Sequence, residues 1–389
     1  MGKNDSYYRG GSFQREKKRR RFSLADLILF PATVVVCLLL ATAYFAQWID
    51  PHHFGILALI GLILPILYIA CTLCLLYWVI RWKKFALFPL AILIIGFFGI
   101  GLFFRPQFKR TYNDPSEKRD RTTVRTVSYN VMGMMKRENN RLTPRMSTFG
   151  ELVDSLKPDI LCLQEFQSTV WAPKSTFEAY IPDLKYNVIR YKVGDSGSTG
   201  WGLALYSRYP ILHSGYFDFE NTTNSALWAD VKILSDTLRI FNVHLQTTSI
   251  SATDQDFITS MNFVRDSTRS EKFRNMFQKL KRNYVIRASQ ADSIAPLIAA
   301  SPYPVVVCGD FNDTPMSYTY HRMRGKLADS FREAGHGLGY TYRGFFRMLR
   351  IDYILHSSDR IRTVNYFSPD FDCSDHNPVA VDLKIATES

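Results

Sequence analysis

Several apolar, strand-like segments after residue 121 end in an acid, an amide or a histidine. The positions are Asn130 in VSYNVMG, Glu165 in DILCLQEF, His244 in FNVHLQ, Asp310 and Asn312 in VVVCGDFND, Asp352 in RIDYIL, and Asp375 and His376 in CSDHNPV. Carboxylates are costly to bury without a partner, and catalytic side chains tend to lie where a rigid strand gives way to a loop. The recurrence at several strand ends therefore indicates one shared site.

Taken one at a time, these residues have ordinary explanations. Asn130 alone is typical of a turn, Glu165 of an exposed acid, and His244 of a histidine satisfied within a sheet. GDFNDTP is also a competent turn, because Gly, Asp, Asn and Pro are the usual turn formers, and we assign Asp313 to that turn. Asp352 lies between apolar strand residues and needs a partner. The joint pattern, rather than any single residue, predicts a function.

The residue types suit metal-assisted hydrolysis of a phosphoester. Mg²⁺ prefers carboxylate and amide oxygens, with waters and a substrate phosphate completing its shell, and Glu165 and Asn130 supply such oxygens. The metal neutralises phosphate charge during in-line displacement. A histidine with a near-neutral pKa can take a proton from water, and a buried carboxylate is the usual partner that fixes the tautomer of such a histidine.

The elements that must position these residues form an α/β domain, residues 122–389. The apolar strand candidates are TVRTVSY, DILCL, YNVIRY, GLALYS, ALWADVKI, LRIFNVHL, PVVVCGD, RIDYIL and PVAVDL. Several alternate with period two, as half-buried strands do. PRMSTFGELVDSLKP has helical periodicity, and residues 256–300 indicate two further helical pieces. The six cysteines form neither a disulfide framework nor a zinc pattern.

Residues 24–104 contain three apolar runs, at about 24–48, 54–79 and 85–104. Each reaches the roughly 20 residues that a helix needs to cross a bilayer, so we predict three transmembrane helices. Residues 1–23 form a basic tail, and residues 105–121 form a polar linker.

Charge indicates the orientation in the membrane. The net charge is +13, and the first 21 residues hold eight Lys or Arg against two Asp or Glu. Because this block directly precedes an apolar run, we interpret it as a cytoplasmic flank rather than a nucleic-acid-binding arm. The link RWKK has three basic residues and IDPHH has none. This places the tail and RWKK in the cytoplasm and the α/β domain outside, at the cytoplasmic (inner) membrane.

A cleaved signal peptide is the alternative for the first run, because Ala41-Thr42-Ala43 resembles a cleavage site. Two later spans would still anchor the protein and export the α/β domain. Residues 270–287 have two readings as well, an amphipathic helix on an anionic membrane surface or a helix packed on the sheet with a solvated basic face. The arginines of the Gly-rich segment 335–350 either contact substrate phosphate or belong to a solvated connector.

The motifs VSYNVMG, PDILCLQE, GLALYSRYPI, FNVHLQ, VVVCGDFNDTP, RIDYIL and SDHNPV, in this order, resemble those of the endonuclease/exonuclease/phosphatase superfamily, over roughly residues 122–385. The resemblance implies a DNase-like four-layer α/β sandwich with two facing mixed sheets, preceded by the three transmembrane helices. It also implies a metal-dependent phosphoric ester hydrolase that uses Mg²⁺ or Mn²⁺.

The resemblance also assigns a role to each residue. His376 is the general base, and Asp352 orients it. Asp310 positions the nucleophile, Asn312 contacts the phosphate, and His244 stabilises the charge that develops on the phosphate oxygens. For the metal, Glu165 is the carboxylate ligand, Asn130 lies beside it, and Asp375 binds through water.

The motifs predict the reaction but not the substrate. An enzyme held at a bilayer meets lipid head groups at high effective concentration, so we predict a phosphodiesterase that acts on a lipid or its head group. The architecture resembles that of lipid-acting members of the superfamily. A nuclease that acts on extracytoplasmic DNA is the alternative, and it requires basic and aromatic side chains along its cleft. The sequence predicts no particular oligomeric state.

Overall fold

The computed structural model describes residues 22–106, 120, 122–138, 141–169, 173–194, 200–248 and 267–386. Nearly all of the predicted basic tail and most of the predicted linker lie outside these residues.

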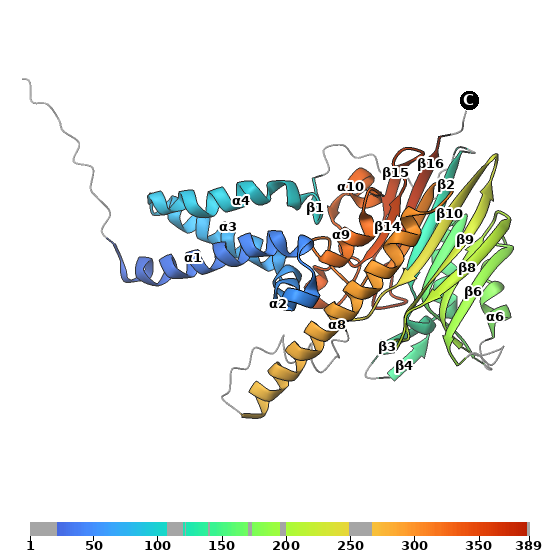
Figure 1. Ribbon diagram of the computed structural model, residues 1–389, viewed down its shortest axis with the longest axis horizontal. Helices are drawn as coiled ribbons and strands as arrows, with labels where there is room; N and C mark the ends of the chain where they lie inside the picture. The colour runs from blue at the N-terminus through green and yellow to red at the C-terminus, as the bar shows by residue number, and fades with distance from the viewer. Residues whose placement is uncertain are drawn as a thin grey trace, which may run out of the picture.

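Two six-stranded mixed sheets form the centre of the molecule (Figure 1). The first has the order β15 (Ile361–Phe367), β16 (Val379–Ile385), β2 (Thr123–Asn130), β5 (Ile160–Ser168), β7 (Gly200–Ser207) and β6 (Tyr186–Val193). The second has the order β12 (Ala328–Asp329), β14 (Asp352–His356), β11 (Val305–Asp310), β10 (Asp236–His244), β9 (Ser225–Ile233) and β8 (Ile211–Asp218). The pairs β2–β5 and β10–β11 are parallel, and the other neighbours are antiparallel.

Apolar side chains fill three layers around these sheets. Between the sheets, Cys162 and Leu205 of the first pack with Ile240 and Val306 of the second. The outer face of the first sheet packs against α5 (Met146–Leu156) and α6 (Lys174–Glu178). The outer face of the second packs against α8 (Ser267–Ala299) and α9 (Tyr318–Arg324). This arrangement confirms the predicted sandwich of two mixed sheets.

The smaller elements lie at the ends of the sandwich. They are the two-stranded sheets β1 (Phe104–Arg105) with β13 (Gly337–Leu338) and β3 (Met135–Glu138) with β4 (Arg141–Pro144), the helix α10 (Ser330–Ala334), and the 3₁₀ turns η3 (Met132–Met134) and η4 (Phe345–Arg347). Two further 3₁₀ turns, η1 (Ala46–Trp48) and η2 (Lys84–Ala86), belong to the N-terminal region.

Each of the nine predicted strands corresponds to a strand of the structure. Two long strands, β8 and β15, are not among the predictions. Both lie at the edge of a sheet, where side chains are less buried and apolar alternation is weaker. In β8, Leu212, His213 and Ser214 are all exposed in succession. The helix predicted to end before Pro158 is α5.

The two helical pieces predicted at 256–300 form one helix of 33 residues, α8, over the described part. Its first turns project away from the sandwich (Figure 1). From Leu280 onward, one stripe of side chains that includes Tyr284 and Ala288 is buried, while Lys281 and Arg282 are exposed. From Leu280 onward, the helix therefore fits the predicted reading of a packed helix with an exposed basic face, whereas its first turns do not pack on the sheet.

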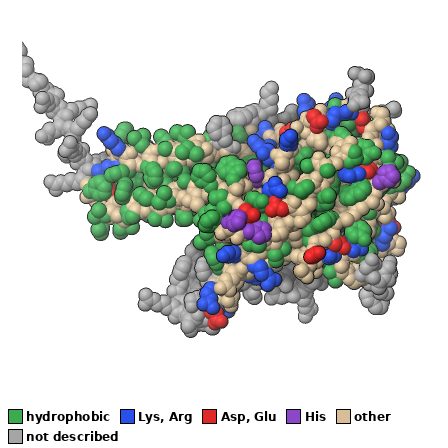
Figure 2. Space-filling view, in the orientation of Figure 1, with side chains coloured by type: hydrophobic (Ala, Val, Ile, Leu, Met, Phe, Trp, Pro, Cys, Tyr) green, Lys and Arg blue, Asp and Glu red, His purple; other side chains and the backbone are tan. Residues whose placement is uncertain are grey.

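The N-terminal region contains α1 (Leu24–Phe45), α2 (Pro51–Leu62), α3 (Leu64–Ile80) and α4 (Leu87–Ile100). Helices α1, α3 and α4 lie side by side and extend away from the sandwich, and we call them the arm (Figure 1). Apolar side chains cover the visible surface of the arm (Figure 2). Salt-bridged Asp26 and Arg81 mark its tip. At its base, Trp48 contacts His321 of α9.

The prediction of three full transmembrane helices is wrong. Among the described residues, only the helix Leu24–Trp48, with 25 residues, is long and apolar enough to cross a bilayer as a single helix. Helices α2 and α3 are separated by a bend of 57°. Pro65, in the first turn of α3, has no amide hydrogen and so cannot continue the hydrogen bonds of α2 into α3. The third apolar helix, Lys84–Phe97, is one of the shorter apolar helices of 10–17 residues. A helix needs roughly 20 residues to cross a bilayer.

Candidate active site

The predicted catalytic residues converge at one edge of the sandwich because of strand direction and register. Asn130, His244 and Asp310 are the last residues of β2, β10 and β11. Asp352 begins β14, which runs antiparallel to β11, so that Asp310 pairs with Asp352 on one side and with His244 on the other. The two sheets therefore bring residues that are far apart in the sequence to one place.

Glu165 reaches the same place through an irregularity in its strand. The register of β5 against β7 shifts between Leu163 and Phe166, and Glu165 has a positive φ of 53°. A bulge of this kind redirects a side chain. The Asn130 Nδ2 donates hydrogen bonds to Glu165 Oε1 at 3.1 Å and to Asp310 Oδ2 at 2.9 Å. Asn130 thus joins a carboxylate from each sheet.

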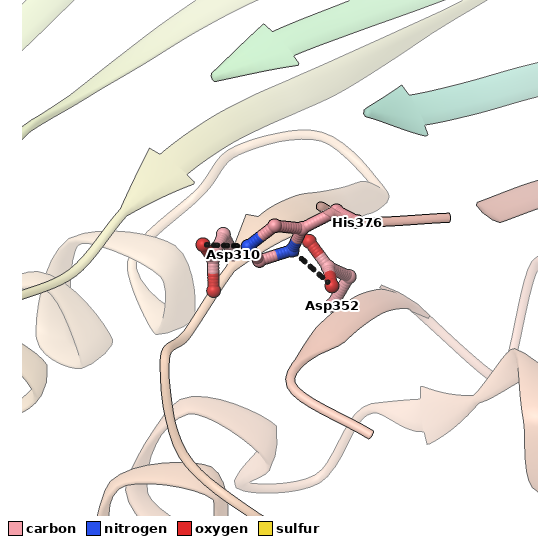
Figure 3. A group of neighbouring side chains, drawn as sticks. All are labelled: Asp310, Asp352 and His376. Atoms are coloured by element: carbon pink, nitrogen blue, oxygen red, sulfur yellow. Dashed lines mark hydrogen bonds and ion pairs between the residues drawn. The ribbon is translucent and has the colours of Figure 1, made fainter. Parts of the chain in front are cut away.

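His376 lies between two carboxylates (Figure 3). Its Nδ1 is 2.9 Å from Asp352 Oδ2, and its Nε2 is 3.7 Å from Asp310 Oδ2. All three residues are buried. Burial would lower the pKa of His376, but the Asp352 and Asp310 carboxylates outweigh it and raise the pKa well above its usual value. A proton on this imidazole is therefore stabilised.

Two residues that the sequence analysis missed support this pair. The Thr341 hydroxyl accepts the backbone N–H groups of Ile351 and Asp352, both at 3.0 Å. The Tyr342 ring packs edge-on against the His376 ring, with centroids 5.3 Å apart. Both residues belong to the segment 335–350, and no local sequence signal marks them, since a Thr-Tyr pair in a loop is common.

Asp310 and His244 respond to burial in opposite ways. Burial and then the Asp352 carboxylate raise the pKa of Asp310 to about 6. Burial lowers the pKa of His244, so its imidazole is neutral near pH 7. The His244 Nε2 lies 3.7 Å from Glu165 Oε1 and 3.8 Å from Asp310 Oδ2. This nitrogen is buried and has no hydrogen-bond partner within the part of the chain that the structure describes, so it can form a hydrogen bond with a bound ligand.

Asn312 follows Asp310 in a tight turn with a positive φ of 53°. Its backbone N–H donates to Asp310 Oδ1 at 2.8 Å, and its Nδ2 donates to the Leu245 carbonyl at 3.2 Å. Asp313 lies in the same turn, as predicted, but it is buried and 3.2 Å from the Arg287 Nη1 of α8. Asp313 therefore also ties the turn to a helix.

Asp375 is exposed, unlike the other predicted residues of the site. Its Oδ1 accepts a hydrogen bond from the Ser374 hydroxyl at 3.3 Å. The pKa of Glu165 is raised mainly by burial and further by the negative charge of Asp375. Asp375 is therefore close enough to Glu165 to influence the same cation.

The donor set fits a hard divalent cation. Within the described residues, the side chains at ion-pair distance from Glu165, Asp310 and Asp352 are histidines only. Asp352 Oδ1, like His244 Nε2, is buried without a hydrogen-bond partner. Several buried carboxylates without Lys or Arg are costly unless a cation binds among them. Asp310, Asp352 and His376 also each offer one ligand atom, all within 4.8 Å of one another.

The arginines of the segment 335–350 have partners within the protein. Arg343 and Arg347 form ion pairs with Asp370, and Arg350 is buried against Asp329. Of the two predicted interpretations of these arginines, the contacts favour a connector segment over phosphate binding.

Residues 127–376 match the sequence model of the endonuclease/exonuclease/phosphatase family. The chain belongs to this family. The resemblance noted in the sequence is thereby confirmed, and this endonuclease/exonuclease/phosphatase family member is a phosphoric ester hydrolase. A second model, described only as a domain of unknown function, matches residues 26–103, which correspond to the arm and α2. A search of the curated proteins found no match.

Solved structures similar to this family member include an endonuclease/exonuclease/phosphatase from Beutenbergia cavernae, with 16% identity, 68% of this chain and 72% of that chain covered and a TM-score of 0.49. A protein of the same description from Bacteroides vulgatus has 19% identity, coverage of 68% and 99% and a TM-score of 0.48. The human nocturnin catalytic domain with bound sulfate has 17% identity, coverage of 68% and 94% and a TM-score of 0.45. The family assignment rests on the sequence match and not on these structures.

Proposed function

We propose that the chain is a membrane-anchored phosphodiesterase that hydrolyses a lipid or its head group with the help of Mg²⁺ or Mn²⁺. The observation that carries the lipid assignment is the contact between the N-terminal region and residues that neighbour Asp352 and His376. Leu62, at the end of α2, packs with Leu349 and Ile351 and with the Tyr342 ring. Ile351 precedes Asp352 in the chain, and Tyr342 covers His376. A head group at the base of the arm is therefore adjacent to the site.

His376 is the proposed general base. Because Asp352 accepts a hydrogen bond at Nδ1, Nε2 is left to accept a proton from water. Asp310 Oδ2, 3.7 Å from Nε2, accepts a hydrogen bond from the same water and orients it toward phosphorus. The two carboxylates then stabilise the imidazolium that forms.

His244 and Asn312 are proposed to bind the phosphate oxygens. A neutral imidazole donates through one ring nitrogen, and His244 Nε2 has no hydrogen-bond partner among the described residues. The Asn312 amide has two N–H groups, and the second remains after the bond to Leu245. Glu165 would hold the metal together with Asn130, and Asp375 would act through water. A bound Mg²⁺ or Mn²⁺ neutralises phosphate charge.

The proposed anchor is the arm, with the helix Leu24–Trp48 crossing the cytoplasmic membrane and α3 and α4 inserted beside it. The N-terminus of α1 and the Arg81–Lys84 link lie together at the tip, since Asp26 pairs with Arg81. The sandwich lies at the base. The positive-inside rule then puts the basic tip in the cytoplasm and the sandwich outside.

Phosphorus NMR of a total membrane-lipid extract tests this proposal. We expect the purified protein with Mg²⁺ in detergent to remove a lipid phosphodiester signal, and EDTA to prevent the loss. The signal that disappears identifies the head group. If no lipid signal changes while the same preparation nicks plasmid DNA, the lipid assignment is wrong and the nuclease alternative holds.

A further inference from the structure

A groove of about 920 Å³ runs along the seam between α3 and α4 and ends against the sandwich. Pro65, Ile69 and Leu73 line it from α3, and Ile94 and Phe97 from α4. The positions on each helix are spaced by three or four residues, which places them on one face. From Pro65 to Leu73 the groove follows the helix for about 12 Å at 1.5 Å per residue.

The groove has apolar walls, and the Tyr68 and Thr72 hydroxyls along it are engaged within the protein. The Tyr68 hydroxyl donates to the Gly96 carbonyl at 2.7 Å, and the Thr72 hydroxyl donates to the Tyr68 carbonyl at 2.8 Å. At the end of the groove, the Arg350 guanidinium binds both carboxylate oxygens of Asp329. Arg350 Nε is buried without a hydrogen-bond partner among the described residues, but the guanidinium charge is paired with Asp329. The apolar walls therefore suit a hydrocarbon chain.

The inner end of the groove lies next to the active site. Tyr340 and Arg350 line this end, and the two segments that they begin run on to Tyr342 and Asp352. Backbone hydrogen bonds join these segments, since Thr341 N–H donates to the Leu349 carbonyl at 2.9 Å and the Thr341 hydroxyl accepts from Asp352 N–H. The groove thus ends at Tyr340 and Arg350, which precede Tyr342 and Asp352 by two residues in the sequence.

We infer that this groove binds an acyl chain of the lipid whose phosphodiester is hydrolysed, an inference that rests on the proposed function. An ordinary bilayer lipid could lie against any apolar face of the arm. This groove has walls from both the arm and the loop that leads into Asp352. Chain binding here holds the glycerol end at the base of the arm, beside the site.

The test compares two tryptophan substitutions on the arm. Ile69→Trp fills the groove, while Leu38→Trp adds the same bulk to α1 outside it. Both positions are apolar and similarly exposed, at 52% and 57%. Rates are measured in mixed micelles on dioleoyl and dihexanoyl forms of phosphatidylglycerol and phosphatidylethanolamine, and on the soluble diester bis(p-nitrophenyl) phosphate. A dioleoyl lipid with a photoreactive acyl chain reports binding directly.

We expect Ile69→Trp to lower the dioleoyl-to-dihexanoyl rate ratio at least about tenfold, the usual effect of losing a methylene-sized contact in an apolar pocket. Its rate on the soluble diester, and all rates of Leu38→Trp, should match the unmodified protein. The photoreactive chain should label α3 or α4 residues of the groove, and Ile69→Trp should remove that labelling.

The possible failures are distinguishable. If the unmodified protein hydrolyses the soluble diester but neither lipid, the proposed function is wrong and this inference falls with it. If it hydrolyses lipids and Ile69→Trp leaves the chain-length ratio unchanged, the inference alone is wrong. A change in oligomeric mass with an unchanged ratio would assign the groove to a second copy of the chain.

Discussion

The hydrogen bond between His376 and Asp352 is the feature on which the proposed proton transfer depends. Asp352→Asn leaves a side chain of the same size but removes the charge that fixes the Nδ1–H tautomer. We expect turnover to fall by about 10²–10⁴-fold, the usual contribution of general-base catalysis, with circular dichroism unchanged. The control is Asp359→Asn, in an exposed turn. Full activity of Asp352→Asn would contradict the assignment.

Glu165 is the carboxylate that we assign to the metal. Glu165→Gln keeps the acceptor geometry but removes one negative charge, so the site should bind the cation more weakly. We expect the Mg²⁺ concentration for half-maximal activity to rise at least about tenfold. Titration of activity with Mg²⁺ measures this, with Glu178→Gln as control because Glu178 pairs with Lys174 on the surface of α6. An unchanged Mg²⁺ requirement would count against Glu165 as a ligand.

Asp352, Glu165 and His376 could be predicted from the sequence because each is a polar residue next to an apolar strand. The sequence did not predict Thr341, Tyr342 or Arg287, because their contribution depends on contacts between distant segments. Arg287 is an example. It lies within a basic helix, yet its side chain is buried and donates to the Gln246 carbonyl at 2.8 Å. Only the packing of α8 against the loop after β10 reveals this contact.

At the scale of elements, the central strands were predictable, whereas of the edge strands only β6 was predicted. β2, β5, β10 and β11 are buried on both faces, and their apolar runs are nearly continuous. β8 and β15 lie at the sheet edges with exposed positions. Their pairing is decided by their neighbours, which a single sequence does not display. The apolar runs predicted that the arm is helical. They did not predict the helix lengths, because the break between α2 and α3 depends on local backbone geometry.

The buried ion pair of Asp329 and Arg350 connects β12, the loop before β14 and the base of the arm. Arg350 Nη2 also donates to the Leu102 carbonyl at 3.0 Å. Asp329→Asn would leave a buried, uncompensated guanidinium, and we expect the free energy of unfolding to fall by about 3–5 kcal/mol. Denaturant unfolding in detergent measures this change.

The matched control is Asp370→Asn, which breaks an exposed pair with Arg347. Exposed pairs contribute about 0–1 kcal/mol. Equal effects of the two substitutions would show that the buried pair does not hold the arm and the sandwich together.

At the scale of the whole molecule, one apolar arm and one catalytic sandwich share a continuous core. Leu40 and Leu64 of the N-terminal region belong to the same buried cluster as Val307 and Tyr353 of the sandwich. The sandwich is therefore fixed at the base of the arm rather than tethered at a distance. This arrangement favours a substrate that lies in the membrane surface.

Sidedness is tested by a reporter fused after Ser389. Because the helix Leu24–Trp48 separates the basic tip from the sandwich, we expect alkaline phosphatase, which is active only outside the cytoplasm, to be active in this fusion. A fluorescent protein that matures only in the cytoplasm should be dark in the same position. The reverse pattern would overturn the proposed orientation and, with it, the outer leaflet as the source of substrate.

The most direct test of the central claim is the rate of lipid phosphodiester hydrolysis by three proteins in one membrane-lipid preparation with Mg²⁺. They are the unmodified protein, His376→Ala and the control His213→Ala. His213 is an exposed histidine on the edge strand β8. The account predicts equal hydrolysis by the unmodified protein and His213→Ala and none above background by a folded His376→Ala. Hydrolysis by His376→Ala at the unmodified rate would contradict it.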